Sequence, residues 1–277
     1  MTTIVNNYLL AGGEAELERL RQQACVWESE TETLLDSIGV QTGWNCIDLG
    51  CGGTGILGSL SRRVGPNGQV VGIDIKPEQL EAAHAFVQEA QLTNVKILER
   101  DVYATGLPRG SFDLVHVRFV FAPSGRDEAL LREMLALTRP GGVIVIQEPD
   151  ASAWSCFPPN PAWDRLKGAI LVAFAQCGGD FNVGRRTYGM LRRAGLEEVR
   201  VRAAVIALQD RHPYMRLPIQ FATLLRRRIL ERGLLNEAEL DEAIATCEQS
   251  VRAPDTCVLS FVVTQVWGHK PHRQNPR

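Results

Sequence analysis

The sequence predicts an α/β fold: a doubly wound, Rossmann-like sheet of seven mostly parallel strands with an antiparallel last strand, plus a helical cap and lid. Two observations carry this prediction. From residue 44 to residue 147, short apolar runs alternate with amphipathic segments of helical period, which implies βαβ crossovers in a parallel sheet. The first apolar run also stops at a cluster of glycines, as a buried strand does where it meets a tight turn.

The individual elements follow from local signals. Residues 13–39 carry apolar positions at helical spacing and predict one or two helices. Pro77 opens a later helix, because the first turn of a helix tolerates proline. The predicted strands are 44–49, 69–74, 95–98, 112–118, 143–147, 199–208 and 257–267, and the further predicted helices are 56–64, 77–91, 127–138, 162–176, 183–194, 218–232 and 237–251.

The composition excludes several classes of protein. The 277 residues are 45% hydrophobic and 22% charged, as in ordinary globular proteins and unlike disordered or collagen-like chains. Thirty basic residues face thirty-two acidic ones, so the chain lacks the basic excess of a nucleic-acid-binding protein. No apolar run approaches the ~20 residues of a membrane span. We therefore expect neither a nucleic acid partner nor a membrane span.

Cysteine usage and the N-terminus predict a location. The seven cysteines are odd in number and form no C-x-x-C motif, which favours a reduced compartment and no metal site. Residues 1–7 lack the basic and apolar stretches of a secretory signal. The expected location is cytoplasmic.

The residues with the clearest chemical meaning follow the first strand. Asp48 precedes Gly50, Gly52 and Gly55, whose G-x-G-x-x-G spacing gives a tight turn, close backbone approach to a ligand and free N–H groups at a helix start. Asp74 ends the second strand, nineteen residues after Gly55, where a carboxylate can accept both hydroxyls of an adenosine ribose. Together these residues indicate a nucleoside-bearing cofactor.

The identity of that cofactor depends on Asp48. Dinucleotide dehydrogenases use the same turn, with its N–H groups facing a pyrophosphate. A carboxylate two residues before the first glycine would repel a pyrophosphate, but could help to hold a cationic amino-acid group, directly or through water. Asp48 thus favours S-adenosylmethionine over a nicotinamide dinucleotide.

The stretch from about Asn45 to Gln147 resembles the class I S-adenosylmethionine-dependent methyltransferases, particularly the small-molecule enzymes grouped with the ubiquinone/menaquinone-biosynthesis type. Five motifs stand in the family's usual order. The chain departs from the common pattern at Thr54, where many members have the glycine that this chain places at Gly55. The motifs are residues 46–52, 71–74, 99–102, 112–118 and 137–142.

The resemblance implies a set of residues that bind S-adenosylmethionine, with S-adenosylhomocysteine as the product. Asp74 would bind the ribose hydroxyls and Ile75 would pack on the adenine. Asp101 would accept from the adenine amino group, and Val102 would contribute its backbone N–H. The residues lining the methionine and ribose would be Gly50 and Gly52.

The resemblance also implies contacts at the methionine end. The Val117 carbonyl and Arg118 would lie near it, and an N-terminal cap helix would bring Tyr8 and Gln23 toward the cofactor, unless these two only pack. The implied cofactor-binding set is therefore Tyr8, Gln23, Asp48, Gly50, Gly52, Gly55, Asp74, Ile75, Asp101, Val102, Val117 and Arg118.

Methyl transfer from a sulfonium is an in-line displacement, so the protein must mainly align the nucleophile and exclude water. If the acceptor is a hydroxyl or an acidic carbon, a base helps to remove its proton. The candidates are His116, Glu148 and Asp150, near the carboxyl ends of the fourth and fifth strands, where open α/β sheets bind ligands. The alternatives are a hydrogen-bonded structural histidine and a solvated loop.

The expected function is O- or C-methylation of a small, fairly apolar molecule, in secondary or quinone-like metabolism. The alternative is a protein of the same fold that binds S-adenosylmethionine without methyl transfer, such as a cyclisation catalyst or a binding subunit. A homodimer is left open. The acceptor would lie under a lid whose aromatic residues are Trp154, Phe157, Trp163, Phe174, Phe181 and Phe221, most of which we expect to pack the lid onto the sheet.

One catalytic domain is expected to span the chain. It consists of an N-terminal helical cap (1–42), a cofactor-binding core (43–150), a lid insertion (151–181), a continuation of the core (182–208), a helical lid insertion (209–256), the last core strand (257–269) and a disordered tail (270–277).

Overall fold

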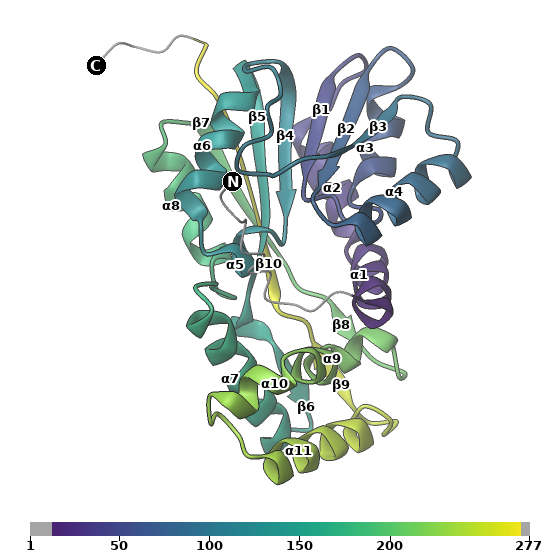
Figure 1. The fold of residues 1–277 in the computed structure, drawn as a ribbon, viewed down its shortest axis with the longest axis vertical. Helices are drawn as coiled ribbons and strands as arrows, with labels where there is room; N and C mark the ends of the chain where they lie inside the picture. Colours follow the sequence, from purple (N-terminus) through teal and green to yellow (C-terminus); the bar gives the residue numbers. More distant parts are fainter. Residues whose placement is uncertain (1–12, 273–277) are drawn as a thin grey trace.

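A computed structural model describes residues 13–272 of the chain, and its centre is a seven-stranded sheet with the order β3-β2-β1-β4-β5-β10-β7 (Figure 1). Three of the five side chains of β1 are apolar (Cys46, Ile47 and Leu49), and all three are fully buried, as in a strand that is covered on both faces. The strands are β1 Asn45–Leu49, β2 Gln69–Asp74, β3 Val95–Glu99, β4 Phe112–Arg118, β5 Thr138–Asp150, β7 Glu197–Ala204 and β10 Val262–His269.

The strand directions confirm the predicted mixed sheet. Strands β1 to β5 pair in parallel with their neighbours, while β10 lies antiparallel between β5 and β7. Within this register, Val266 of β10 opposes Ile146 of β5 on one side and Val201 of β7 on the other. The carboxyl ends of β1, β2, β3 and β4 therefore meet at one edge of the sheet, where parallel α/β folds bind ligands.

Helices cover both faces of this sheet (Figure 1). The helices α2 Glu28–Ile38, α3 Leu57–Val64 and α4 Pro77–Glu89 bury their apolar side chains against one face. The helices α6 Asp127–Leu137 and α8 Gly184–Arg193 cover the other face. Burying both faces removes the apolar strands from water, and this burial is the main stabilising force of a parallel sheet.

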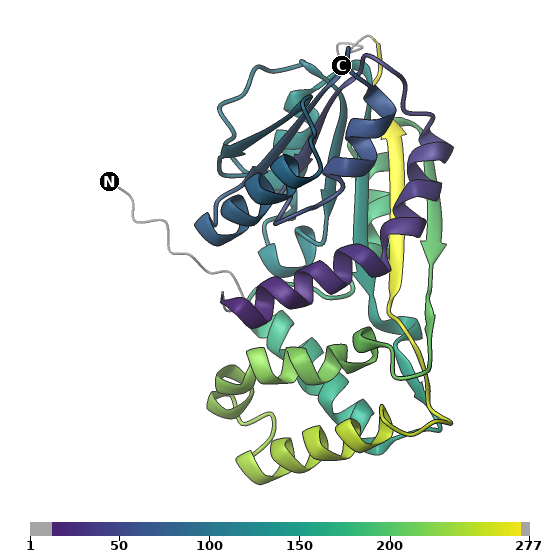
Figure 2. The ribbon, with the colours of Figure 1, turned by 90° about the vertical axis from the view of Figure 1, so that its right-hand side faces the viewer.

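A second, mainly helical lobe lies beyond the carboxyl edge of the sheet (Figure 2). It contains a three-stranded sheet with the order β6-β9-β8 and shares one hydrophobic core with the neighbouring helices. Its elements are β6 Ser155–Phe157, α7 Pro161–Gln176, β8 Ala207–Leu208, α9 Leu217–Leu224, α10 Arg226–Glu231, α11 Glu237–Ser250 and β9 Cys257–Leu259.

The two last predicted strands each divide between the two lobes. The range 199–208 becomes β7 and β8, and the range 257–267 becomes β9 and β10. Both divisions occur where Ser260 meets Ile206: the Ser260 N–H donates to the Ile206 carbonyl, and the Ile206 N–H donates to the Ser260 hydroxyl at 2.9 Å. This pair of hydrogen bonds joins the two strands as they pass from the central sheet to the small one.

The N-terminal helix α1, Glu14–Val26, lies between the two lobes (Figure 2). Trp27 separates it from α2 and is only 1% exposed. The Trp27 ring packs against Phe119 and Phe261, and its indole N–H donates to the Tyr214 hydroxyl at 3.1 Å. These contacts tie the N-terminal cap to both lobes.

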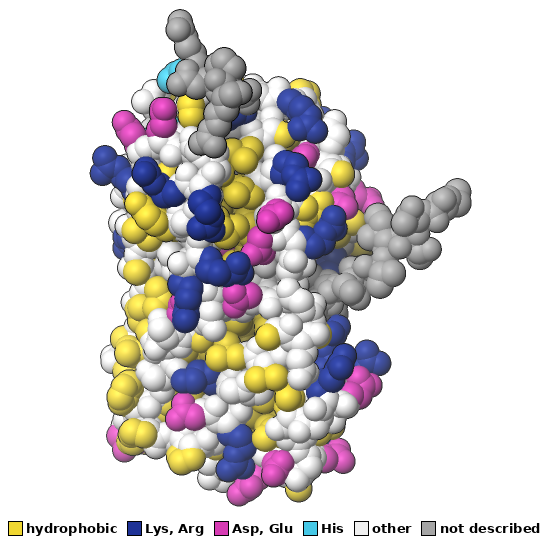
Figure 3. All heavy atoms as spheres, turned by 90° about the vertical axis from the view of Figure 1, so that its left-hand side faces the viewer, with side chains coloured by type: hydrophobic (Ala, Val, Ile, Leu, Met, Phe, Trp, Pro, Cys, Tyr) yellow, Lys and Arg dark blue, Asp and Glu magenta, His cyan; other side chains and the backbone are white. Residues whose placement is uncertain are grey.

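The described surface carries mixed charge. Figure 3 shows Lys and Arg side chains interspersed with Asp and Glu over the face that it presents. Within residues 13–272, no helix has the length and apolar character needed to cross a membrane. In the same range, no three His, Cys, Asp or Glu side chains are grouped to hold a metal ion.

The aromatic residues of the second lobe pack against one another. Phe181 stacks on Trp154 at 5.4 Å with an interplanar angle of 8°, and meets Phe174 edge-on at 5.2 Å. Phe221 lies 5.9 Å from Phe181, and all four side chains are at most 4% exposed. These rings therefore form the core of the lobe itself, whereas the sequence predicted that most of the lid aromatics pack the lid onto the sheet.

We predict that Phe181→Ala lowers the free energy of unfolding by about 3–5 kcal/mol, because it leaves a cavity at the centre of the aromatic cluster. Phe157→Ala is the control, since Phe157 is 49% exposed, and should cost less than about 1 kcal/mol. Urea unfolding of both variants measures the difference. Equal costs would contradict a packed aromatic core.

Candidate functional site

A cavity of about 620 Å³ opens at the carboxyl edge of the parallel strands, and its size lies within the range of ligand-binding pockets. Its walls come from the loops that follow β1, β2, β3 and β4, and from one side each of α1 and α4. Segments far apart in the chain therefore meet at the position where an open α/β sheet binds its ligand.

The glycine turn after β1 forms the floor of the cavity. Gly50, Gly52 and Gly55 have φ angles of 72°, 56° and 50°, a region that glycine adopts without steric cost. The N–H groups of Gly50 and Cys51 both donate to the Ile73 carbonyl of β2, which folds the turn back onto the sheet. A Cβ atom at Gly55 would lie 2.3 Å from Asp48 Oδ2, so this position accepts only glycine without rearrangement.

Asp74 lies at the end of β2, on the rim of this turn. Its Oδ2 accepts from the Gly52 N–H at 3.0 Å, and its Oδ1 accepts from the N–H groups of Ile75 and Lys76 at 2.8 and 3.0 Å. Burial raises the pKa of Asp74, while these N–H groups act to lower it. The backbone thus fixes a carboxylate whose remaining lone pairs face the cavity.

Two further predicted residues lie beside Asp74. Ile75 is 42% exposed and lines the cavity, an unusual position for a large apolar side chain unless a ligand covers it. Asp101 and Val102, in the loop after β3, line the same region. The Asp101 Oδ1 accepts from the Tyr103 N–H at 2.9 Å, which fixes the orientation of the carboxylate.

Asp48 lines the cavity below the glycine turn, although it is only 2% exposed. Its Oδ1 lies 2.7 Å from His116 Nδ1, and its Oδ2 accepts from the Ile56 N–H at 3.1 Å. Burial acts to raise the pKa of Asp48, but His116, the Ile56 N–H and the charge of Arg118 hold it below its ordinary value. The cavity therefore contains a buried anion at the foot of the turn.

Arg118 at the end of β4 lies on the other side of the glycine turn. It donates to the Gly55 carbonyl at 3.2 Å and to the Thr31 hydroxyl at 3.1 Å, and it lines the cavity. The neighbouring Val117 side chain is fully buried in the core against α6 and α8 and is not among the cavity-lining residues. Arg118 thus lines the cavity as predicted, whereas the predicted contact of the Val117 carbonyl stays a prediction.

His116 is placed away from the cavity by its hydrogen bonds. The ring is 0% exposed, with Nδ1 on Asp48 and Nε2 2.9 Å from Gln147 Nε2. It is not among the described residues that line the cavity. The structural alternative therefore describes His116 better than the predicted role of a base.

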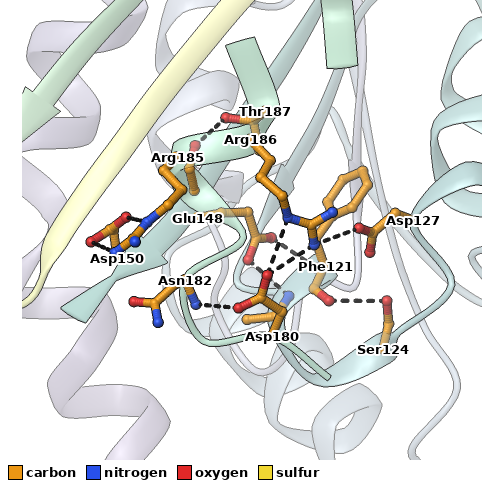
Figure 4. A network of polar contacts seen from close by, with 12 residues as sticks. Phe121, Ser124, Asp127, Glu148, Asp150, Asp180, Asn182, Arg185, Arg186 and Thr187 are labelled. Carbon is orange, nitrogen blue, oxygen red and sulfur yellow. Dashed lines mark hydrogen bonds and ion pairs between the residues drawn. The ribbon is translucent and has the colours of Figure 1, made fainter. Parts of the chain in front are cut away.

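Glu148 and Asp150 are also occupied elsewhere (Figure 4). The Glu148 carboxylate accepts from the N–H groups of three successive residues, 120 to 122, at 2.8, 2.9 and 3.1 Å, which opens the short helix α5 Phe121–Ser124. Asp150 binds Arg185 through both oxygens, at 2.5 and 2.8 Å. Neither carboxylate lines the cavity, so the expectation that one of them lies over it is corrected by the positions of their donors.

The N-terminal cap brings Gln23 to the cavity. Gln23 on α1 lines it, and its Oε1 accepts from Arg19 at 2.8 Å. Arg19 in turn forms a buried ion pair with Glu16. Tyr8, the other predicted cap residue, lies outside the described residues.

The sequence did not single out Gln79, which also lines the cavity, from the first turns of α4. Its side chain is 4% exposed, and its Oε1 has no hydrogen-bond partner within residues 13–272. A Cβ atom at Gly52 would lie 3.5 Å from this oxygen, which places it beside the glycine turn. A ligand with an N–H or O–H group at this point would satisfy it, since an unpaired buried acceptor is costly. The available signal was a polar side chain on the buried side of the helix that follows Asp74.

These residues fit the cofactor that the sequence predicts. The positive-φ turn leaves room for a ligand against its backbone, Asp74 offers acceptors for hydroxyls, and Ile75 offers an apolar platform. Asp48 supplies a negative charge for a cationic group, and the unpaired Gln79 oxygen can accept one more hydrogen bond.

Comparison with known proteins identifies the core. The family described as a methyltransferase domain matches residues 41–170. A demethylmenaquinone methyltransferase of Lactococcus lactis is 31% identical over 127 residues, 46% of this chain and 49% of that protein. One from a Geobacillus species is 30% identical over 122 residues, 44% of this chain and 51% of that protein. The chain aligns with only about half the length of these curated relatives.

Solved structures share the fold of nearly the whole chain at low identity. An S-adenosylmethionine-dependent methyltransferase from Aquifex aeolicus superimposes with a TM-score of 0.54 at 17% identity, covering 92% of this chain and 99% of that one. A phosphoethanolamine N-methyltransferase from Haemonchus contortus, in complex with S-adenosylhomocysteine, gives 0.55 at 16% identity, covering 88% and 52%. The [4+2]-cyclase SpnF gives 0.50 at 20% identity, covering 88% and 83%.

The fold and the glycine turn with its strand-end acid are typical of Rossmann-like proteins that bind adenosyl cofactors. Within that class, residues 41–170 match the model of a methyltransferase domain, and the proteins that the chain resembles include a demethylmenaquinone methyltransferase and an S-adenosylmethionine-dependent methyltransferase.

We predict a pH-dependent contribution of Glu148 to stability. Burial raises its pKa to about 8, against the three backbone N–H groups that act to lower it. Because the folded state then binds this proton more tightly than the unfolded state, the free energy of unfolding falls as pH rises from about 4.5 to about 8, by at most about 1.4 kcal/mol per pH unit.

Glu148→Gln removes this titrating group. As pH rises through that window, the free energy of unfolding of the wild type should therefore fall relative to that of Glu148→Gln. Urea unfolding at several pH values measures it. Parallel pH profiles of the two proteins would contradict the raised pKa.

Proposed function

We propose that this protein is an S-adenosylmethionine-dependent methyltransferase that acts on a small, fairly apolar molecule. The observation that carries the proposal is one cavity that joins the cofactor cradle of the glycine turn and Asp74 to an apolar wall. Matched relatives are named for methylation of demethylmenaquinone, which supports a small-molecule acceptor. We assign O- or C-methylation in secondary or quinone-like metabolism.

The apolar wall is the proposed acceptor site. Leu17, Leu20 and Ala24 of α1 face the cavity, together with Phe119 and Val120 from the loop after β4. The buried lid aromatics do not line this space, because they pack within their own lobe. We therefore assign acceptor contacts to α1 and the loop after β4, in place of the insertions 151–181 and 209–256.

Bound S-adenosylmethionine would supply a methyl group on a sulfonium and leave as S-adenosylhomocysteine. The protein would position the acceptor against the methyl group and exclude water from the reacting atoms. Asp74 and Ile75 would hold the nucleoside half, and Asp48 the cationic amino-acid half. Helix α1 would cover the reacting groups, since it forms one wall of the cavity. Because His116, Glu148 and Asp150 are engaged elsewhere, the proposed rate enhancement rests on alignment of the acceptor.

The second candidate is a protein that binds S-adenosylmethionine without transferring its methyl group. The observation that favours it is the structural neighbour SpnF, a [4+2]-cyclase by name. An apolar cavity without a placed base would suit such a role as well.

The remaining parts of the proposal concern context. All seven cysteines are free, which supports a reduced, cytoplasmic location. We also propose that the chain forms one catalytic domain with a cap and insertions. Its proposed partner is a small molecule, and its proposed oligomeric state is a homodimer.

We predict that Asp74→Ala weakens S-adenosylmethionine binding about 10–100-fold, because it removes a carboxylate that would accept hydrogen bonds from the ribose. Isothermal titration calorimetry measures the dissociation constant. Asp164→Ala is the control, because the Asp164 side chain is 67% exposed and forms an ion pair with Lys167 on the surface of α7. No binding by the wild type, or equal affinity of wild type and Asp74→Ala, would overturn the proposed cofactor.

We predict that S-adenosylhomocysteine accumulates when the wild type is incubated with S-adenosylmethionine and demethylmenaquinone, the substrate named for the relatives. Leu20→Trp should lower this rate at least about tenfold by filling the apolar wall, while the affinity for S-adenosylmethionine changes less than about threefold. Mass spectrometry measures the product. Cofactor binding without product from this or other small apolar acceptors would favour the second candidate.

A further inference from the structure

A row of polar side chains crosses the buried interior of the sheet. The row consists of one side chain from each of five strands, which are neighbours in the sheet in the order β7-β10-β5-β4-β1. Four of its members are 0–2% exposed, and only the one at the edge of the sheet reaches solvent. The members are Arg202, Gln265, Gln147, His116 and Asp48.

Each member is hydrogen-bonded to the next. Arg202 Nη1 lies 2.6 Å from Gln265 Oε1, and Gln265 Nε2 lies 2.8 Å from Gln147 Oε1. Gln147 Nε2 lies 2.9 Å from His116 Nε2, and His116 Nδ1 lies 2.7 Å from Asp48 Oδ1. The row is therefore a continuous chain from a cation at the sheet edge to an anion in the cavity.

Only one direction of donation fits this chain. A guanidinium has donors and no acceptor, so Arg202 must face the oxygen of the Gln265 amide. The Gln265 NH2 group then faces the oxygen of Gln147, and the Gln147 NH2 group faces His116 Nε2. Nε2 must therefore accept, which leaves the ring proton on Nδ1, directed at Asp48.

A second cation imposes the same direction. Arg118 Nη1 donates to the Thr31 hydroxyl at 3.1 Å, so the hydroxyl proton is free to donate to Gln147 Oε1, 3.4 Å away. Two arginines on opposite sides thus orient the Gln265 amide and the Thr31 hydroxyl, which both donate to Gln147 Oε1. The orientation of Gln147 is fixed twice, and with it the orientation of His116.

We propose that this chain fixes the His116 proton on Nδ1 and thereby holds Asp48 as an oriented anion for the cationic end of the ligand. Gln147 and His116 are then positioning residues, because they act on the ligand only through Asp48. The part concerning the ligand rests on the proposed S-adenosylmethionine site, whereas the part concerning the proton depends on the chain alone.

The burial of Asp48 explains why such a device is needed. A carboxylate in a nearly dry site must satisfy its lone pairs, or it costs several kcal/mol. The Ile56 N–H and His116 Nδ1–H supply one donor to each oxygen. Asp48 can then keep its charge without rotating toward Arg118, and its remaining lone pairs stay directed at the cavity.

The first test concerns the proton. Long-range ¹H–¹⁵N correlation spectra report which nitrogen of each imidazole carries a proton, and the chain has only five histidines. The signal of His116 is assigned by its loss in His116→Asn. We expect a protonated Nδ1 and an unprotonated Nε2 in the wild type. A proton on Nε2 would overturn the proposal.

Gln147→Glu is the diagnostic variant, because a carboxylate has the shape of the amide but cannot donate to Nε2. We expect a proton to appear on His116 Nε2 in this variant. Thr138→Val is the matched control: it removes one buried hydrogen bond from the same strand, the 2.7 Å bond to the Met134 carbonyl, and should leave the His116 signals unchanged. An unprotonated Nε2 in folded Gln147→Glu would contradict the proposal.

The second test concerns the ligand and uses two probes. S-adenosylmethionine carries the cationic amino-acid group, and 5′-methylthioadenosine lacks it. We expect Gln147→Glu and Gln147→Met to weaken binding of S-adenosylmethionine about tenfold, while 5′-methylthioadenosine binding changes less than about twofold. Equal losses for both probes would mean that the chain is only structural and would overturn its role toward Asp48.

The two tests separate this inference from the proposed function. If the wild type binds neither probe but His116 carries its proton on Nδ1 and responds to Gln147→Glu, the proposed cofactor fails and the directed chain stands. If the wild type binds both probes and the proton lies on Nε2, the chain fails and the cofactor stands. Should Gln147→Glu fail to fold, Arg202→Met tests the same direction of donation from the exposed end of the chain.

Discussion

The close approach of Gly55 to Asp48 is the constraint on which the site depends. No side chain fits at Gly55 without displacing the Asp48 carboxylate, and that carboxylate accepts a hydrogen bond from the N–H of Ile56, the residue that caps α3. The turn, the start of α3 and the floor of the cavity are thus fixed by one buried anion. Its cost is offset by His116 and the polar chain behind it, so the ligand site and the sheet interior form one electrostatic unit.

The sequence predicted the parts of the fold that local chemistry specifies. The glycine turn and the acid at the end of β2 depend on residues close in the chain, and the cavity lining contains Asp48, Asp74, Ile75, Asp101 and Arg118 as expected. The strand alternation likewise gave the sheet, because its apolar period is readable over a few residues. The assigned roles of these residues toward a cofactor stay predictions.

The predictions about the two carboxylates failed because their partners lie far away in the chain. Glu148 was expected near the pocket because it follows the predicted fifth strand, 143–147, but three backbone N–H groups from the loop after β4 hold its carboxylate elsewhere. The Asp150 carboxylate is held away from the cavity by its ion pair with Arg185, which lies on α8. The small sheet was missed because its strands have only two or three residues, too few for a recognisable period.

The helical lobe supports one edge of the cavity. Its buried aromatic side chains pack within its own core. The lobe therefore acts on a bound acceptor through the cavity wall that it holds in place. That support reaches α1 through the Trp27–Tyr214 hydrogen bond and through Arg19, whose guanidinium lies 4.9 Å over the Phe221 ring. The helix that carries the apolar wall is thus anchored in the lobe, while the cofactor cradle is anchored in the sheet. A change in the lobe's core can therefore move one half of the cavity and leave the other half in place.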